Sequence, residues 1–221
     1  MPLTALPTVR VGSQSAVLEL PQLDMKTCLV RCTTSRRIAR MATSSPYLEK
    51  EKHMSDIRWP EKYLPGATDN YVSNEVIIAG LTSAQVWPYL NDTTHWPICY
   101  KNASEIGFED GAGPELAAGV HFRFTTFGMK VEAEVTEYAP PSEGSPARVS
   151  FRAWIVGSNE ADASALHAWL IEDLPGGRVR VLTQESQIGE PAKQMAVMKP
   201  NPVLNAHQDW LKGLAQAAAA R

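Results

Sequence analysis

Two histidines and a glutamate are the side chains of this sequence best placed for acid–base chemistry. His167 lies in an alternating segment, residues 165–173, and the alternation puts it on the same face as Trp169 and Ile171. Imidazole titrates near neutral pH, so an inward-facing His167 could move a proton in an aldol cyclisation or a dehydration. The ordinary alternative is a half-buried histidine that is hydrogen-bonded to a neighbouring strand or aromatic side chain.

The other two candidates come from different segments but point to the same interior. His207 lies on the apolar stripe of a C-terminal helical pattern, one turn before Trp210 and Leu211. Glu185 shares a strand face with apolar residues, so it could lie beside His167 and fix the tautomer of that imidazole. Being near the end of a strand, Glu185 could instead reach solvent. We therefore predict that His167, His207 and Glu185 are the catalytic residues, if the protein has a catalytic site.

Aromatic residues on the predicted inner faces could form the wall of a ligand-binding site. Core packing explains the same residues at least as well. Tyr100 could also supply a hydroxyl group at the mouth of a cavity. The predicted ligand-binding residues are Trp96, Tyr100, Phe122, Phe124, Phe151, Trp169 and Trp210.

Several other kinds of site are not supported by the spacing of the residues. The sequence has no Ser-His-Asp order, phosphate-binding loop, G-x-G-x-x-G motif or paired-histidine metal spacing. Cys28 and Cys32 form a C-x3-C pair, but no second pair of ligands stands nearby to complete a zinc site. We predict no metal and no cofactor. With Cys99, the cysteines number three, and an odd number is typical of a reducing compartment such as the cytoplasm.

The elements that must position these residues follow one after another from residue 68. Short, turn-rich connections between successive strands predict an antiparallel sheet with one apolar face and one polar face. Two short helices follow the first strand, at 82–90 and 95–100, and an amphipathic helix of about five turns begins at Val203. The predicted strands cover 72–78, 104–108, 120–127, 130–138, 148–156, 165–173 and 178–187. A curved sheet wrapped around that last helix is a helix-grip arrangement, an α+β fold.

The first 53 residues differ in composition from the rest. They carry eight Lys and Arg against four acidic residues, whereas residues 54–221 carry 13 against 20, and every Trp and Phe lies in the later part. We predict a flexible N-terminal extension over 1–53 and a ligand-binding domain over 54–221. Four arginines among hydroxyl residues in 27–45 resemble part of a mitochondrial presequence, which would place the protein in the matrix.

Four segments of the chain match the pattern of a known superfamily: NEVIIA at 74–79, VWPYLND at 86–92, HWP at 95–97 and WLIEDLPGGRV at 169–179. They resemble the SRPBCC (START/Bet v 1-like) superfamily, especially its polyketide cyclase/dehydrase-like branch. The resemblance covers roughly residues 68–219 and rests on core and turn residues. It implies a helix-grip fold with a curved sheet of about seven strands and a deep cavity for a hydrophobic small molecule, without implying one reaction.

The resemblance leaves three functions open. The first is a carrier or binding protein for a lipid, polyketide or isoprenoid-like compound. The second is a cofactor-free polyketide cyclase or dehydratase of secondary metabolism, a lyase or isomerase. The third is a mitochondrial quinone-binding protein. A net charge of about −7 on residues 54–221 argues against nucleic acid as a partner, and nothing approaches the roughly 20 apolar residues of a membrane span.

Overall fold

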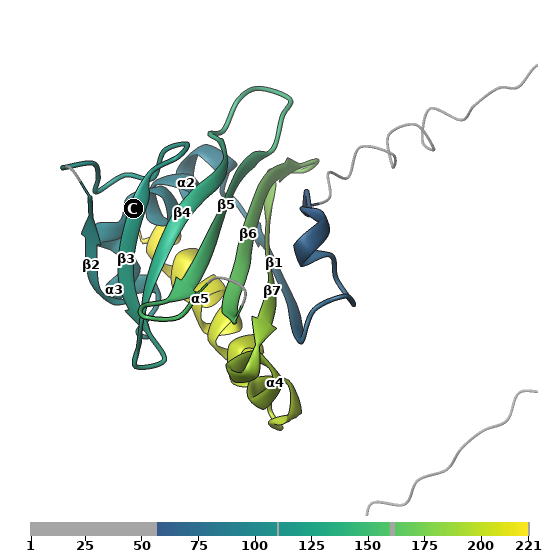
Figure 1. Cartoon of the computed structure of the whole chain (residues 1–221). Helices are drawn as coiled ribbons and strands as arrows, with labels where there is room; N and C mark the ends of the chain where they lie inside the picture. The colour runs from purple at the N-terminus through teal and green to yellow at the C-terminus, as the bar shows by residue number, and fades with distance from the viewer. Residues whose placement is uncertain (1–56, 110, 160–161, 221) are drawn as a thin grey trace, which may run out of the picture. The chain divides into compact units, whose positions relative to one another are not determined.

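Seven strands form one curved antiparallel sheet, in the order β1-β7-β6-β5-β4-β3-β2 (Figure 1). The structure is a computed structural model that describes residues 57–109, 111–159 and 162–220. The strands are β1 (Asn70–Ala79), β2 (Ser104–Phe108), β3 (His121–Thr126), β4 (Met129–Ala139), β5 (Ala147–Ile155), β6 (Ala163–Leu174) and β7 (Arg178–Gly189). The N-terminal extension predicted for 1–53 lies outside the described residues.

The helices lie mainly on the concave side of this sheet. The long α5 (Pro202–Ala219) crosses that side behind the strands in Figure 1. The other helical elements are η1 (Glu61–Tyr63), α2 (Ser83–Asn91), η2 (Thr93–His95), α3 (Trp96–Cys99) and α4 (Glu190–Val197). Among the described residues, no helix has both the length and the apolar character needed to cross a membrane.

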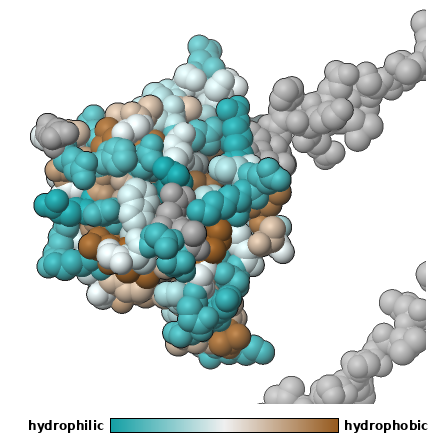
Figure 2. Space-filling model, in the orientation of Figure 1, coloured by the Kyte–Doolittle hydropathy of each residue, from teal (hydrophilic) through white to brown (hydrophobic). Residues whose placement is uncertain are grey.

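Alternation along the strands separates the two faces of the sheet. On β6, His167 and Trp169 face α5, while Leu170 faces the opposite, convex side together with Leu182 of β7. Ile57, which precedes η1, is buried against that convex cluster. Elsewhere on the side shown in Figure 2, hydrophilic residues dominate and hydrophobic residues form small, separate patches.

Two glycines permit close approaches that shape the concave side. A side chain at Gly213 of α5 would place its Cβ 2.1 Å from the carbonyl oxygen of Cys99, so glycine lets α5 lie directly against the end of α3. Gly189 has a φ of 109°, and its Cβ would lie 1.9 Å from the carbonyl oxygen of Asp162. Gly189 therefore allows β7 to turn sharply into α4.

The predicted fold class is confirmed. Each predicted strand corresponds to an observed one, with ends that differ by a few residues, and the helix predicted from Val203 is α5, which begins one residue earlier at Pro202. The concave side of the sheet wraps around α5, which is the helix-grip arrangement.

Candidate functional site

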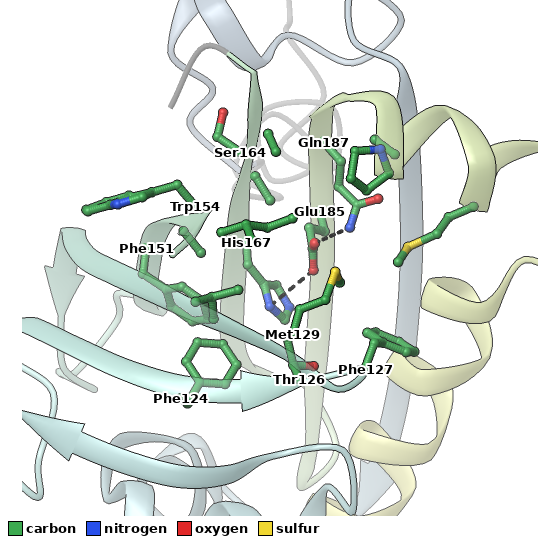
Figure 3. A pocket seen from close by; sticks show the side chains of 18 of the residues that line it. Phe124, Thr126, Phe127, Met129, Phe151, Trp154, Ser164, His167, Glu185 and Gln187 are labelled. Carbon is green, nitrogen blue, oxygen red and sulfur yellow. Dashed lines mark hydrogen bonds and ion pairs between the residues drawn. The ribbon is translucent and has the colours of Figure 1, made fainter. Parts of the chain in front are cut away.

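A cavity of about 100 Å³ lies between the concave face of the sheet and the helices α4 and α5. Figure 3 shows side chains from the strands directed into it. Since a single water needs roughly 10–15 Å³ on this scale, the cavity has room for a small organic molecule. Its apolar wall includes Phe124, Phe127, Met129, Val131, Phe151, Ile155, Ile188, Pro191, Met195 and Trp210.

The polar part of the cavity wall is dominated by His167, Glu185 and His207. His167 and Glu185 stand directly opposite each other in the β6–β7 register, and His207 projects from α5. One carboxylate oxygen, Oε2 of Glu185, lies 2.9 Å from Nε2 of His207 and 3.4 Å from Nδ1 of His167. The structure therefore brings together all three predicted catalytic residues, although they come from three separate elements.

Thr183 fixes the far side of the His167 ring. Its Oγ1 lies 2.8 Å from Nε2 of His167, and a hydroxyl group can either donate or accept there. When Nδ1 of His167 carries the proton, it faces the carboxylate of Glu185, and Nε2 accepts from Thr183. The two imidazoles stack, with ring centroids 4.4 Å apart and planes 10° apart.

A chain of amide side chains supports the carboxylate from behind. Gln187 Nε2 donates to Glu185 Oε1 at 2.5 Å, Asn70 Nδ2 donates to Gln187 Oε1 at 2.6 Å, and Asn201 Nδ2 donates to Asn70 Oδ1 at 3.0 Å. Asn201 is also the N-cap of α5, where its Oδ1 accepts from two backbone N–H groups. Every amide points its donor towards Glu185, so the chain favours a negative charge on that carboxylate.

Burial and these contacts shift the acid–base properties of the cluster. Burial tends to raise the pKa of Glu185, but the charges and hydrogen bonds of His167 and His207, with the Gln187 amide, outweigh it and hold that pKa at about 2. Burial, reinforced by the neighbouring His207, lowers the pKa of His167 to about 3, although Glu185 opposes the shift. The carboxylate is thus ionised and the His167 ring is neutral near pH 7.

Two buried polar atoms in the cavity wall have no hydrogen-bond partner among the described residues. They are Nδ1 of His207 and Nε1 of Trp210, and both residues line the cavity. A buried polar group without a partner is costly, so these two atoms reduce the stability of the fold at the cavity wall.

The predicted aromatic wall divides into two groups. Four of the seven residues line the cavity: Tyr100, Phe124, Phe151 and Trp210. The other three, Trp96, Phe122 and Trp169, lie outside its lining and pack behind it in the core. Tyr100 stacks on Trp210 with ring centroids 4.2 Å apart, and burial raises its pKa to about 12. Its hydroxyl group therefore stays protonated.

Sequence reasoning missed the groups that support the carboxylate and some of the residues that line the cavity. Asn70, Gln187 and Asn201 were not singled out, because their roles depend on how β1, β7 and the start of α5 meet. Phe127 lies in the turn after β3, and Met129 is the first residue of β4. Both are half-buried and line the cavity at a hairpin that interrupts the strand alternation. Thr183 lies two residues before Glu185 on β7, so strand alternation puts the two side chains on the same face of the sheet.

One solved structure is clearly related to the chain. It is the hypothetical protein jhp0584 from Helicobacter pylori, which is 44% identical, with a TM-score of 0.70, and the match covers 75% of this chain and 97% of that one. The name of this relative states no activity, so the likeness concerns family and fold.

Other solved structures are much less similar. Ara h 8.0201 is 11% identical with a TM-score of 0.49, and the match covers 69% of this chain and 99% of that one. Norcoclaurine synthase from Thalictrum flavum is 8% identical with a TM-score of 0.48, over 68% and 94% of the two chains. At these values the likeness carries no argument about activity. No protein-family model matches the chain, and no curated protein matches it either.

Proposed function

The chain belongs to the same family as the Helicobacter pylori protein jhp0584 and has a helix-grip fold, and from this premise we propose that it is a small-molecule binding or carrier protein of the SRPBCC type. Its ligand is a mainly apolar compound with one polar end, of the size of a small polyketide or isoprenoid fragment. The cavity between the sheet and α5 is the binding site.

The observation that carries this proposal is the uneven distribution of polarity around the cavity. Most of its wall is apolar, while the ionised Glu185 and the imidazoles of His167 and His207 form a polar cluster within it. Burying a charge and two imidazoles costs free energy that an apolar core would avoid. Such a cluster is explained if it holds the polar group of a ligand whose remainder contacts the apolar wall.

A second candidate is a polyketide cyclase or dehydratase that moves protons with the same cluster. It is favoured by the ionised carboxylate between two imidazoles, an arrangement that orients a general base. The two candidates predict effects of different size for His167→Gln. If the protein is an enzyme, the substitution lowers turnover of a polyketone substrate on the order of 10²-fold or more. In a carrier it changes affinity by roughly a few-fold, since one hydrogen bond is worth about 1 kcal/mol.

Filling the cavity tests the proposed binding site. Ala165 lines the cavity from β6, so Ala165→Phe introduces a ring into the space a ligand would occupy. We expect an environment-sensitive apolar dye to bind the parent protein saturably and to lose more than about tenfold in affinity in this variant. Fluorescence titration measures both.

The matched control is Ala219→Phe, the same substitution at an exposed position at the end of α5. Circular dichroism and thermal melting show whether both variants are folded. Dye affinity that is equal in the parent and in both folded variants places the binding site outside the cavity and contradicts the proposal.

A further inference from the structure

We propose that His167, Glu185 and His207 bind one divalent first-row transition-metal ion, of the Zn²⁺ or Fe²⁺ class. Each residue offers one ligand atom, and the three atoms lie within 4.8 Å of one another. Two imidazoles and one carboxylate are a ligand set that such ions accept while keeping coordination positions open. This inference goes beyond the proposed small-molecule binding and needs no organic ligand to be tested.

The distances within the cluster are close to those of a metal site. Metal bonds of about 2.0–2.2 Å to nitrogen and oxygen place neighbouring ligand atoms roughly 3–3.5 Å apart. Glu185 Oε2 lies 2.9 Å from His207 Nε2 and 3.4 Å from His167 Nδ1. Because the imidazoles stack with planes 10° apart, their rings must rotate for both lone pairs to meet at one ion. Both histidines line the cavity, and we expect the rings to rotate towards it.

Two of the three ligands already have the outer contacts that metal ligands require. A metal-bound histidine usually donates its other ring N–H to a neighbour, and a ligating carboxylate is itself hydrogen-bonded. Thr183 Oγ1 stands 2.8 Å from His167 Nε2, and Gln187 donates to Glu185 Oε1 at 2.5 Å. Since the Thr183 hydroxyl can reverse its direction, His167 can shift its proton from Nδ1 to Nε2 and present a lone pair to the ion.

The ligand set also decides which ions fit. Ca²⁺ and Mg²⁺ prefer oxygen ligands, and the cluster offers a single carboxylate. The two imidazoles favour Zn²⁺, Fe²⁺ and Co²⁺ instead. An open coordination position would face the cavity, where a carbonyl, hydroxyl or carboxylate oxygen of a bound molecule could occupy it. Short sequence motifs gave no sign of this site, because its ligands come from β6, β7 and α5.

Titration with Co²⁺ tests the proposal directly. The full-length protein, free of any polyhistidine tag, is stripped with a chelator and titrated while the visible absorption of the ion is followed. We expect about one Co²⁺ per chain, with the strong absorption typical of four- or five-coordinate sites. His207→Gln and Glu185→Gln should each weaken binding by more than about 10²-fold.

The matched control is His121→Gln, which removes an exposed imidazole from β3 and should leave Co²⁺ binding unchanged. A second measurement does not depend on the variants' folding: proton NMR of the Co²⁺-loaded parent should show exchangeable, paramagnetically shifted N–H signals from two imidazoles. The proposal is overturned if the parent binds no Co²⁺ under these conditions, if folded His207→Gln and Glu185→Gln bind it as the parent does, or if the two shifted signals are absent. In each of these three cases, saturable binding of the apolar dye to the metal-free protein would still support the proposed small-molecule binding function.

Discussion

The two ends of the concave face use similar aromatic residues for opposite purposes. At one end, Trp96 is fully buried and meets Phe122, Phe124 and Trp210 at ring-centroid distances of 5.9, 5.6 and 5.0 Å. At the other end, Phe124 and Trp210 turn another side towards a cavity that also contains a buried carboxylate. We call these regions the packed end and the hollow end.

The difference between the ends shows how one core supports both stability and binding. At the packed end, Gly213 lets α5 approach Cys99, so α3 and α5 lie in contact and the indole of Trp96 fills the space between them and the sheet. At the hollow end, α4 and the N-terminal half of α5 both border the cavity, and small residues such as Ala165 and Ala192 line the space. Close packing thus gives way to a cavity where the helix changes.

The largest expected effect comes from Trp96→Ala. The substitution removes a fully buried indole and the hydrogen bond from its Nε1 to the carbonyl of Leu90 at 2.8 Å. We expect the free energy of unfolding to fall by about 3–5 kcal/mol. Chemical denaturation followed by tryptophan-independent circular dichroism measures the loss.

The matched substitution at the hollow end is Phe127→Ala. This side chain is half-buried and borders the existing cavity, so its removal exposes less new apolar surface and should cost roughly 1–2 kcal/mol. Equal losses for the two variants would show that the hollow end is packed as tightly as the other, contrary to the comparison.

The sequence was sufficient to predict which face of the sheet each site residue occupies. Period-two alternation placed His167 and Glu185 inward, and helical spacing placed His207 on the same side. The hairpin also fixes the register between β6 and β7. Because β6 ends at Leu174 and β7 begins at Arg178, residues at equal distances from the turn lie opposite each other, as His167 and Glu185 do.

The position along the concave face could not be predicted in the same way. Alternation gives the same inward signal for Trp169, which packs in the core, and for Phe151, which lines the cavity. Whether a residue meets α5 or empty space depends on where α4 ends and α5 begins. The amide chain from Asn201 through Asn70 likewise joins segments that are distant in sequence, and no local pattern marks it.

A smaller expected difference between the two ends is the chemical reactivity of a cysteine thiol placed at each of them. Cys99 is buried at the packed end, and burial raises the pKa of its thiol to about 11. Only the thiolate form of cysteine reacts, and the raised pKa keeps the Cys99 thiol protonated. The thiolate fraction of Cys99 at pH 8 should therefore be on the order of 10²-fold lower in the folded protein than in the unfolded chain. In a Cys28→Ser, Cys32→Ser background, we expect modification by iodoacetamide at pH 8 to be slower by at least that factor in the native protein than in denaturant.

The hollow end provides the matched thiol. Thr126 is half-buried and lines the cavity, so Thr126→Cys, combined with Cys99→Ser in the same background, should react faster than native Cys99 because the cavity admits the reagent. Mass spectrometry of quenched samples gives both rates. A native Cys99 that reacts as fast as the thiol introduced by Thr126→Cys would mean that solvent reaches the packed end as easily as the cavity, and the distinction between the two ends would then fail. Slow modification of Cys99 that accelerates as the pH rises towards 11, with the protein still folded, would instead tie its inertness to the buried, protonated thiol.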